Sequence, residues 1–421
     1  MRRCALLALF LALPFQLPVG AQLRPQLLGA GSADAFFTDS IVHDIRLLLN
    51  ADDWRTLKAR YLEDTYYPSD FVWNGIVVRN VGIKSRGSGS RSGTKPGLKV
   101  DFSRYTSDQR FLGLKSVVLR NNTQDASNMH ERVSMLFFRR LGIPAPREAY
   151  ARLWVNEQYA GLYTIVEALD KVFLKGAFGE DTGYLYSYDY PAGAAPYYFE
   201  YRGADPGLYV PVPFAPETHD SDPRPEFIEQ LAGAVNLTSD AVFRTVMARY
   251  MDLPAILRFI ALEAFLGDDD GFLGNWGMNN FYTYRFDNTT RFTIIPWDKS
   301  DAFLAGYTPS IWHNITDVPP AQRNRLMARA LGHDDLYASY LDALTKCVQL
   351  ADERLTEDPG GPGWLEREVR REYVQIRDAA RNDEVKPFTN DQFEQSVADL
   401  LEFARQRGAF VSAEIARARV R

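Results

Sequence analysis

The stretch that decides how this sequence is interpreted is residues 266–303, LGDDDGFLGNWGMNNFYTYRFDNTTRFTIIPWDKSDAF. Three successive carboxylates, Asp268 to Asp270, close an apolar segment, and a turn rich in Gly and Asn follows them. Two strand-like runs come next, and a hairpin between them would bring Asn280 and Asp298 together. Divalent cations prefer such hard oxygen ligands on fixed backbone. The stretch therefore predicts an active site.

The same residues also have a simpler interpretation. Asp-Gly and Gly-Asn pairs form turns, and Asp caps helices, so an acidic turn can be only a turn. A calcium loop of the EF-hand type fits poorly, because counting from Asp268 puts Phe272 at the fifth position and brings the glycine two residues early. Spacing alone leaves metal binding and a plain turn both open.

The composition is that of an ordinary globular protein. The chain has 421 residues, enough for one large domain or two lobes. It is 46% hydrophobic and 24% charged, which allows a sizeable core. A formal net charge of −6 argues against nucleic acid as a partner, since phosphate backbones favour basic surfaces.

Residues 1–21 have the pattern of a secretory signal peptide. Arg2 and Arg3 supply positive charge, residues 5–13 an apolar core, and Ala21 a small residue at the cleavage site. Two prolines interrupt the apolar run, which disfavours a membrane anchor. We expect cleavage near Ala21, a secreted, periplasmic or cell-surface protein, and no stable membrane span.

The segment that follows is expected to be strand-rich up to residue 222. Residues 22–38 lack periodicity and are predicted to be a linker, and residues 39–222 an N-terminal lobe. The Pro/Gly/Tyr-rich residues 191–225 are the best candidate for a lobe junction. The elements expected from alternation and helical periodicity are strands at 41–49 and 98–102, hairpins at 72–85 and 153–167, and helices at 52–61 and 128–141.

Helical periodicity dominates the rest of the chain. Residues 223–421 are therefore predicted to form a helical C-terminal lobe that carries the loop at 266–303, which makes the fold class α+β. The expected helices are 226–235, 239–249, 253–266, 322–331, 334–356, 364–381 and 390–417.

A loop rich in Gly, Ser and Arg, residues 86–97, precedes the strand at 98–102. Its backbone N–H groups and the guanidinium of Arg86 could bind phosphate oxygens, so Arg86 is a predicted cofactor-binding residue. The glycine spacing G-x-G-x-x-x-G is one residue longer than the familiar nucleotide pattern, and most such loops are merely mobile. Lys99 alternates with apolar neighbours on the strand, so it faces either solvent or a ligand.

Glu131 begins the helix expected at 128–141. It follows Asn128 by three residues, the spacing of a capping box, so it either supports the helix end or reaches inward to a lysine.

The order of these features matches the order of the working parts of protein kinases. A strand lysine paired with a helix glutamate holds phosphates there, a loop aspartate engages the hydroxyl, and an Asn and an Asp hold Mg²⁺. Strict V-A-I-K, H-R-D and D-F-G motifs are missing from this sequence.

Over roughly residues 41–307 the sequence resembles the CotH family, the spore-coat-protein-H-like atypical kinases. The matching stretches are VGIKSRGSG (81–89), KPGLKVDF (95–102), FLGLK (111–115), GLYTIVE (161–167), NNFYTY (279–284) and IPWD (295–298). The resemblance implies a protein-kinase-like two-lobed fold and metal-dependent transfer of phosphate from ATP to a Ser or Thr hydroxyl of a protein substrate.

The resemblance also implies roles for individual residues. By position, Lys99 contacts phosphate and Glu131 is its helix partner. Asp270 is the catalytic aspartate, because Gly and Phe follow it as Gly-Tyr often does in relatives. Asn280 and Asp298 are the ligands of Mg²⁺ or Mn²⁺.

Some features depart from the kinase pattern. Asp268 and Asp269 compete with Asp270 for the catalytic role. The loop from Asp270 to Asn280 is longer than the kinase D-x-x-x-x-N, and Asp301 could support the metal ligands.

Two other functional classes stay open. A glycosidase would use two carboxylates around a sugar, and the Asp cluster with abundant Tyr and Trp would suit it. A scaffold protein could keep the kinase fold and lose catalysis, in which case it would not bind ATP.

Overall fold

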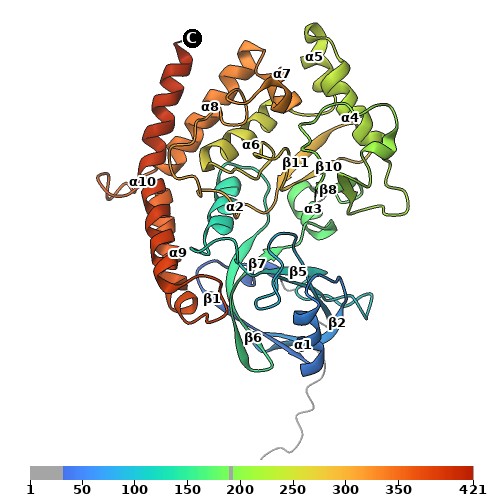
Figure 1. Ribbon diagram of the computed structural model, residues 1–421, viewed down its shortest axis with the longest axis vertical. Coiled ribbons are helices and arrows are strands. Elements are labelled where there is room, and N and C mark those ends of the chain that lie inside the picture. Colours follow the sequence, from blue (N-terminus) through green and yellow to red (C-terminus); the bar gives the residue numbers. More distant parts are fainter. Residues whose placement is uncertain (1–31, 189–192, 421) are drawn as a thin grey trace, which may run out of the picture.

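The computed structural model describes residues 32–188 and 193–420 (Figure 1). The predicted signal peptide and most of the predicted linker lie outside these residues. The chain is strand-rich first and helical later, as predicted; the strands of residues 42–167 gather at one end of Figure 1, and the later strands lie among most of the helices at the other.

Seven strands close into a barrel in the order β1-β2-β3-β4-β5-β7-β6. Neighbouring strands are antiparallel except β1 and β6, which pair in parallel. Inward-facing residues fill the barrel, and the rings of Phe71 and Phe111 pack with centroids 5.0 Å apart. The strands are β1 (Val42–Leu49), β2 (Tyr67–Trp73), β3 (Ile76–Ser85), β4 (Leu98–Asp101), β5 (Ser116–Arg120), β6 (Glu148–Val155) and β7 (Gln158–Glu167).

A second, four-stranded sheet has the order β11-β10-β8-β9 and is antiparallel throughout. Its strands are β8 (Tyr184–Tyr188), β9 (Phe214–Pro216), β10 (Phe281–Arg285) and β11 (Phe292–Pro296). Strands β8 and β9 lie in or next to the segment that the sequence marks as irregular. Strand β8 pairs with β10, which comes much later in the chain, and β9 pairs with β8.

The helices that matter for the site are α2 and α6, and α9 and α10 run along one side of the molecule (Figure 1). The helices are α1 (Ala51–Ala59), α2 (His130–Arg140), α3 (Lys171–Phe178), α4 (Glu226–Leu237), α5 (Asp240–Met247), α6 (Leu253–Leu266), α7 (Arg325–Ala330), α8 (Asp334–Ala351), α9 (Trp364–Arg381) and α10 (Asn390–Arg419).

The hydrophobic cores divide near the end of β7. The core inside the barrel is built from residues 33–165. Tyr186, Tyr188 and the buried apolar residues between Tyr197 and Phe214 pack instead with the C-terminal helices, and so does much of α2. The core therefore changes well before the boundary at 222–223 that the sequence predicts, because β8 and β9 join a sheet with later strands.

Within the described ranges, the structure contains no helix with the length and apolar character needed to cross a membrane.

Candidate active site

The hairpin predicted around the acidic stretch is confirmed. Strands β10 and β11 pair from Phe281 opposite Pro296, and the Trp297 N–H donates to the Asn280 carbonyl over 3.2 Å. Asn280 and Asp298 therefore flank the same end of the hairpin. Both have a left-handed backbone, with φ of 53° and 49°, a conformation that Asn and Asp tolerate better than most residues.

The acidic loop begins where α6 ends. Gly267 terminates the helix in a left-handed conformation, with φ of 62°. Asp270 then accepts hydrogen bonds from the side-chain amides of Asn279, at 2.9 Å, and Asn280, at 2.8 Å. The structure thus joins the predicted catalytic residue directly to one predicted metal ligand. Burial raises the pKa of Asp270 to about 6, against the hydrogen bond from Asn279.

The three successive aspartates have different partners. Asp268 is buried, with its Oδ2 2.8 Å from the Lys299 ammonium. Asp269 lies 3.2 Å from Nε2 of His313. Only Asp270 of the three is bonded to Asn280. The triplet is therefore divided into one structural ion pair, one histidine contact and one carboxylate at the hairpin end.

Lys299 ties this end of the hairpin to α6. Its fully buried ammonium lies 2.6 Å from Oε1 of Glu263, and it donates to the Asn280 carbonyl over 3.2 Å. Burial alone would lower the pKa of Lys299, but the carboxylates of Asp268 and Glu263 raise it above its ordinary value. The lysine stays charged and fixes the loop, the helix and the hairpin together.

Asp298 is held by a cation from the barrel. Arg120, buried at the end of β5, bonds Oδ1 of Asp298, and Ser300 Oγ donates to the same oxygen over 3.0 Å. Burial would raise the pKa of Asp298, but Arg120 and Arg86 hold it below its ordinary range. Asp298 is therefore ionised at neutral pH.

Glu131 reaches into the same group of side chains. Its Oε1 lies 3.2 Å from Nη2 of Arg120, and its Oε2 accepts a hydrogen bond from the backbone N–H of Lys299. Met129 is the N-cap of α2 and makes no side-chain cap bond, so the capping box considered for Asn128 and Glu131 does not form. Burial raises the pKa of Glu131 to about 7.

The implied pairing of Lys99 with Glu131 is wrong. Lys99 lies on β4 opposite Lys84 and Val118, half-buried, and forms no ion pair with any residue of 32–188 or 193–420. Arg120, two residues beyond Val118, is on the same face of the barrel but at the strand end that leads toward α2. It therefore meets Glu131 where a lysine was expected.

Arg86 and the glycine-rich loop lie beside Trp297. The Arg86 guanidinium is 5.5 Å from the centroid of the Trp297 ring, and the backbone N–H of Arg86 closes the loop by donating to the Gly97 carbonyl at 2.9 Å. The Asn121 side chain donates to the carbonyls of Ser90, at 2.8 Å, and Lys95, at 2.7 Å. The loop is thus anchored at its base.

Sequence reasoning missed Arg120, Glu263 and Lys299 as parts of the site. Each is a charged residue that the fold buries: Arg120 ends an apolar strand, Glu263 interrupts an apolar helix, and Lys299 follows Asp298. A single charge within an apolar run is the signal that could have found the first two, since such groups are rarely buried unless they are paired.

Similarity to known proteins extends over most of the chain. The family model described as CotH kinase protein matches residues 83–411. Inner spore coat protein H of Bacillus subtilis (strain 168) is 23% identical over 367 residues, which make up 87% of this chain and 95% of that protein. The solved structure of the Helicobacter pylori proinflammatory kinase CtkA is matched at 10% identity with a TM-score of 0.30, over 77% of this chain and 95% of that one. The family match spans well over half of the sequence, and the chain belongs to the CotH kinase protein family.

Proposed function

We propose that this protein is a secreted atypical kinase with a kinase-like two-lobed fold, which transfers the γ-phosphoryl group of ATP to a Ser or Thr hydroxyl of a protein. One observation carries the proposal: Asp270 is bonded to Asn280 at the hairpin end that also presents Asp298. Membership of the CotH family supports it. Secretion rests on the signal-peptide pattern of residues 1–21.

The donor set at the hairpin end fits a divalent cation. Asn280 Oδ1 and Asp298 Oδ2 accept no hydrogen bond from the described residues, while the other polar atoms of both side chains are engaged. The described ranges hold no group of three or more His, Cys, Asp or Glu that could hold a metal ion. The support for Mg²⁺ (or Mn²⁺) is instead the pair of Asn280 and Asp298, because Mg²⁺ is commonly held by one or two carboxylates together with substrate phosphates. When bound, the cation would neutralise charge on those phosphates.

The phosphates of ATP would be met by cations from the barrel. Lys99 forms no salt bridge in the described ranges; the carboxylate on which its charge acts is that of Glu217, where it opposes the burial that raises the pKa of Glu217, and phosphates would compete with that carboxylate for the ammonium. Arg86 closes the anchored loop whose backbone N–H groups could join it. Glu131 acts indirectly in this proposal, since it holds Arg120 and the amide that follows Asp298.

Asp270 would receive the proton of the acceptor hydroxyl. Each of its oxygens accepts one amide hydrogen bond and keeps a further lone pair. The hydroxyl oxygen forms a bond to the γ-phosphorus, the bond from that phosphorus to the oxygen of ADP breaks, and the hydroxyl proton moves to Asp270.

The test is to incubate the mature protein and a protein acceptor with Mg²⁺ or Mn²⁺ and either γ-labelled or α-labelled ATP. We expect transfer of the γ label only, and loss of both metal-dependent ATP binding and transfer in Asp298→Ala. Transfer of the α label would mean adenylylation instead. A wild-type protein that binds no ATP would be a scaffold that has kept the fold.

A further inference from the structure

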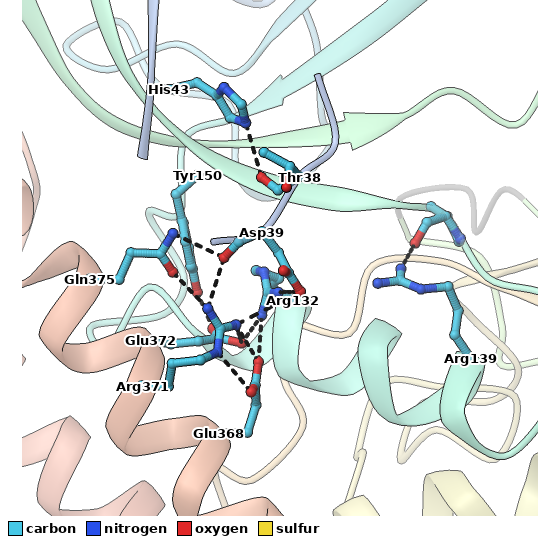
Figure 2. Close-up of polar contacts among 11 residues, drawn as sticks. Thr38, Asp39, His43, Arg132, Arg139, Tyr150, Glu368, Arg371, Glu372 and Gln375 are labelled. Carbon is cyan, nitrogen blue, oxygen red and sulfur yellow. Dashed lines mark hydrogen bonds and ion pairs between the residues drawn. The ribbon is translucent and has the colours of Figure 1, made fainter. Parts of the chain in front are cut away.

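A buried polar network lies between α2, α9 and the segment that enters the barrel. Its centre is Arg132, which is fully buried. The guanidinium bonds Glu372 of α9, lies 3.1 Å from Oε1 of Glu368, and reaches Asp39, ahead of β1, at 2.5 Å. Figure 2 shows this side chain between α9 and the segment that enters the barrel.

Three further side chains close the network. Tyr150 of β6 donates to Oε2 of Glu372 over 2.5 Å. From α9, Arg371 donates to the Asp39 carbonyl at 2.8 Å, and Gln375 donates to the same oxygen at 3.0 Å (Figure 2). The network therefore joins four parts of the chain around the Arg132 guanidinium: the entry segment, α2, β6 and α9.

Arg132 follows Glu131 directly on the first turn of α2. Successive residues of an α-helix project about 100° apart, because 3.6 residues make one turn. Glu131 accordingly reaches Arg120 and the Lys299 N–H, while Arg132 reaches α9. Fixing the direction of one side chain fixes the rotation of the helix, and with it the direction of the other.

We infer that Arg132 is a positioning residue: with Glu368, Glu372 and Asp39 it sets the rotation of α2 at which Glu131 holds Arg120 and the Lys299 amide. The inference rests on the proposed function in that these groups border the proposed site. Contact between apolar side chains is non-directional, whereas the five N–H donors of an arginine form a rigid fork. In this inference, the apolar side of α2 stabilises the packing of the helix, and the polar network fixes the rotation of α2 about its own axis.

The experiment uses isosteric substitutions in the full chain. Arg132→Met would leave the two buried carboxylates of Glu368 and Glu372 without this cation and could unfold the protein, so Glu368→Gln is the main variant. Glu366→Gln is its matched control, since Glu366 is on the same helix with a similarly buried side chain (12% exposed against 10%), but it pairs with Arg370 and Arg405 away from α2. Asp39→Asn tests the same network from a different element.

Hydrogen exchange of the peptide covering residues 297–303 reports whether Glu131 still holds the Lys299 amide, with no need for activity. We expect exchange there to be about tenfold faster in Glu368→Gln and Asp39→Asn and unchanged in Glu366→Gln. The turnover number, measured well below the melting temperature of each variant, should fall in the first two variants only.

Unchanged exchange at 297–303 in Glu368→Gln, or an equal change in Glu366→Gln, would overturn the inference. If exchange responds as expected while even the wild-type protein transfers no phosphate, the positioning role stands and the proposed function fails.

Discussion

Lys95 at the base of the glycine-rich loop and Lys99 on the adjoining strand are four residues apart and in opposite situations. The Lys95 ammonium is buried 2.7 Å from Asp383 and donates to the Leu162 carbonyl at 2.9 Å. Lys99 is half-buried and has no ion-pair partner in the described ranges. The ion pair of Lys95 joins the barrel to the connection between α9 and α10. The charge of Lys99 is in no salt bridge of the described ranges and could bind a ligand.

The same contrast separates the carboxylates of the acidic loop. Asp268 forms a buried ion pair with Lys299, as Lys95 does with Asp383. Asp270 accepts only neutral amides and keeps free lone pairs. A charged group whose partner is built into the fold contributes to structure, and one whose partner is missing is a candidate for function.

The largest effect on stability should come from breaking the buried ion pair of Lys95 and Asp383. Lys95→Met leaves Asp383 buried without its cation, and loss of one partner of a buried pair costs about 3–5 kcal/mol. We expect the free energy of unfolding in denaturant to fall by that amount, with ATP affinity retained by the folded fraction.

A double variant sharpens this prediction. Lys95→Met with Asp383→Leu removes both charges, so much of the lost stability should return, because apolar residues can replace a buried pair at little cost. If the double variant is no more stable than Lys95→Met, the ion pair is not the origin of the loss.

Next in size is the effect of Asp270→Asn on catalysis. The amide cannot accept a proton at neutral pH, so turnover should fall by about 10²-fold or more while metal-dependent ATP binding is kept. Steady-state kinetics and equilibrium binding measure the two separately. Asp269→Asn is the control and should be milder, and an inactive Asp269→Asn beside an active Asp270→Asn would move the catalytic role by one residue.

Local patterns predicted much of the fold. Alternation predicted β1 and β4, and turn residues predicted the hairpins β2–β3 and β6–β7, although most of β2 and most of β6 lie outside the predicted ranges. All five residues of β5 are buried, so it shows no alternation and was missed. Strand β8 was missed because its place is set by pairing with β10, much later in the sequence.

The residues of the site also divide into those that local sequence patterns predict and those that contacts between distant elements determine. The hairpin that joins Asn280 to Asp298 is local, and its turn residues are visible in the sequence. The partners Arg120 and Lys299 are set by contacts between distant elements, which no spacing reports. For that reason the sequence predicts a pair of Lys99 and Glu131, whereas in the structure Glu131 pairs with Arg120.

A smaller effect is expected from Lys99→Ala. If Lys99 contacts phosphate, its loss should weaken ATP binding about tenfold, which is the lower end of what a hydrogen bond to a charged group contributes. Because Lys99 forms no salt bridge in the described ranges and acts on Glu217 only from a longer distance, the melting temperature should hardly change. Titration calorimetry and thermal unfolding of one sample give both values. A lowered melting temperature with unchanged affinity would make Lys99 a structural residue like Lys95.

Glu148 offers a third situation, a buried carboxyl group that forms no ion pair with a cation in the described ranges and is not left available to a ligand. No cation lies within ion-pair distance of it in the described ranges, and its nearest titratable partner is the side chain of Glu131, to which a protonated Glu148 can donate a hydrogen bond. Burial together with Glu131 raises the pKa of Glu148 well above the ordinary value, against Arg120, Arg139 and Arg132. The folded protein therefore keeps a proton that the unfolded chain releases above pH of about 4.3. The resulting stabilisation is complete below that pH and is lost as pH rises toward the folded-state pKa, by at most about 1.4 kcal/mol per pH unit for one proton.

Glu148→Gln cannot ionise, so its free energy of unfolding should fall less steeply than that of the wild type as pH rises from about 5 to 8. Denaturant unfolding at several pH values measures the slope. Glu366→Gln is the control, because Arg370 and Arg405 hold the pKa of Glu366 below its ordinary value although burial would raise it. Its effect on stability should be constant across that range. An unchanged slope in Glu148→Gln would mean that Glu148 is ionised in the folded protein and that its charge is balanced by the arginines of α2 and β5, as the charge of Lys95 is balanced by Asp383.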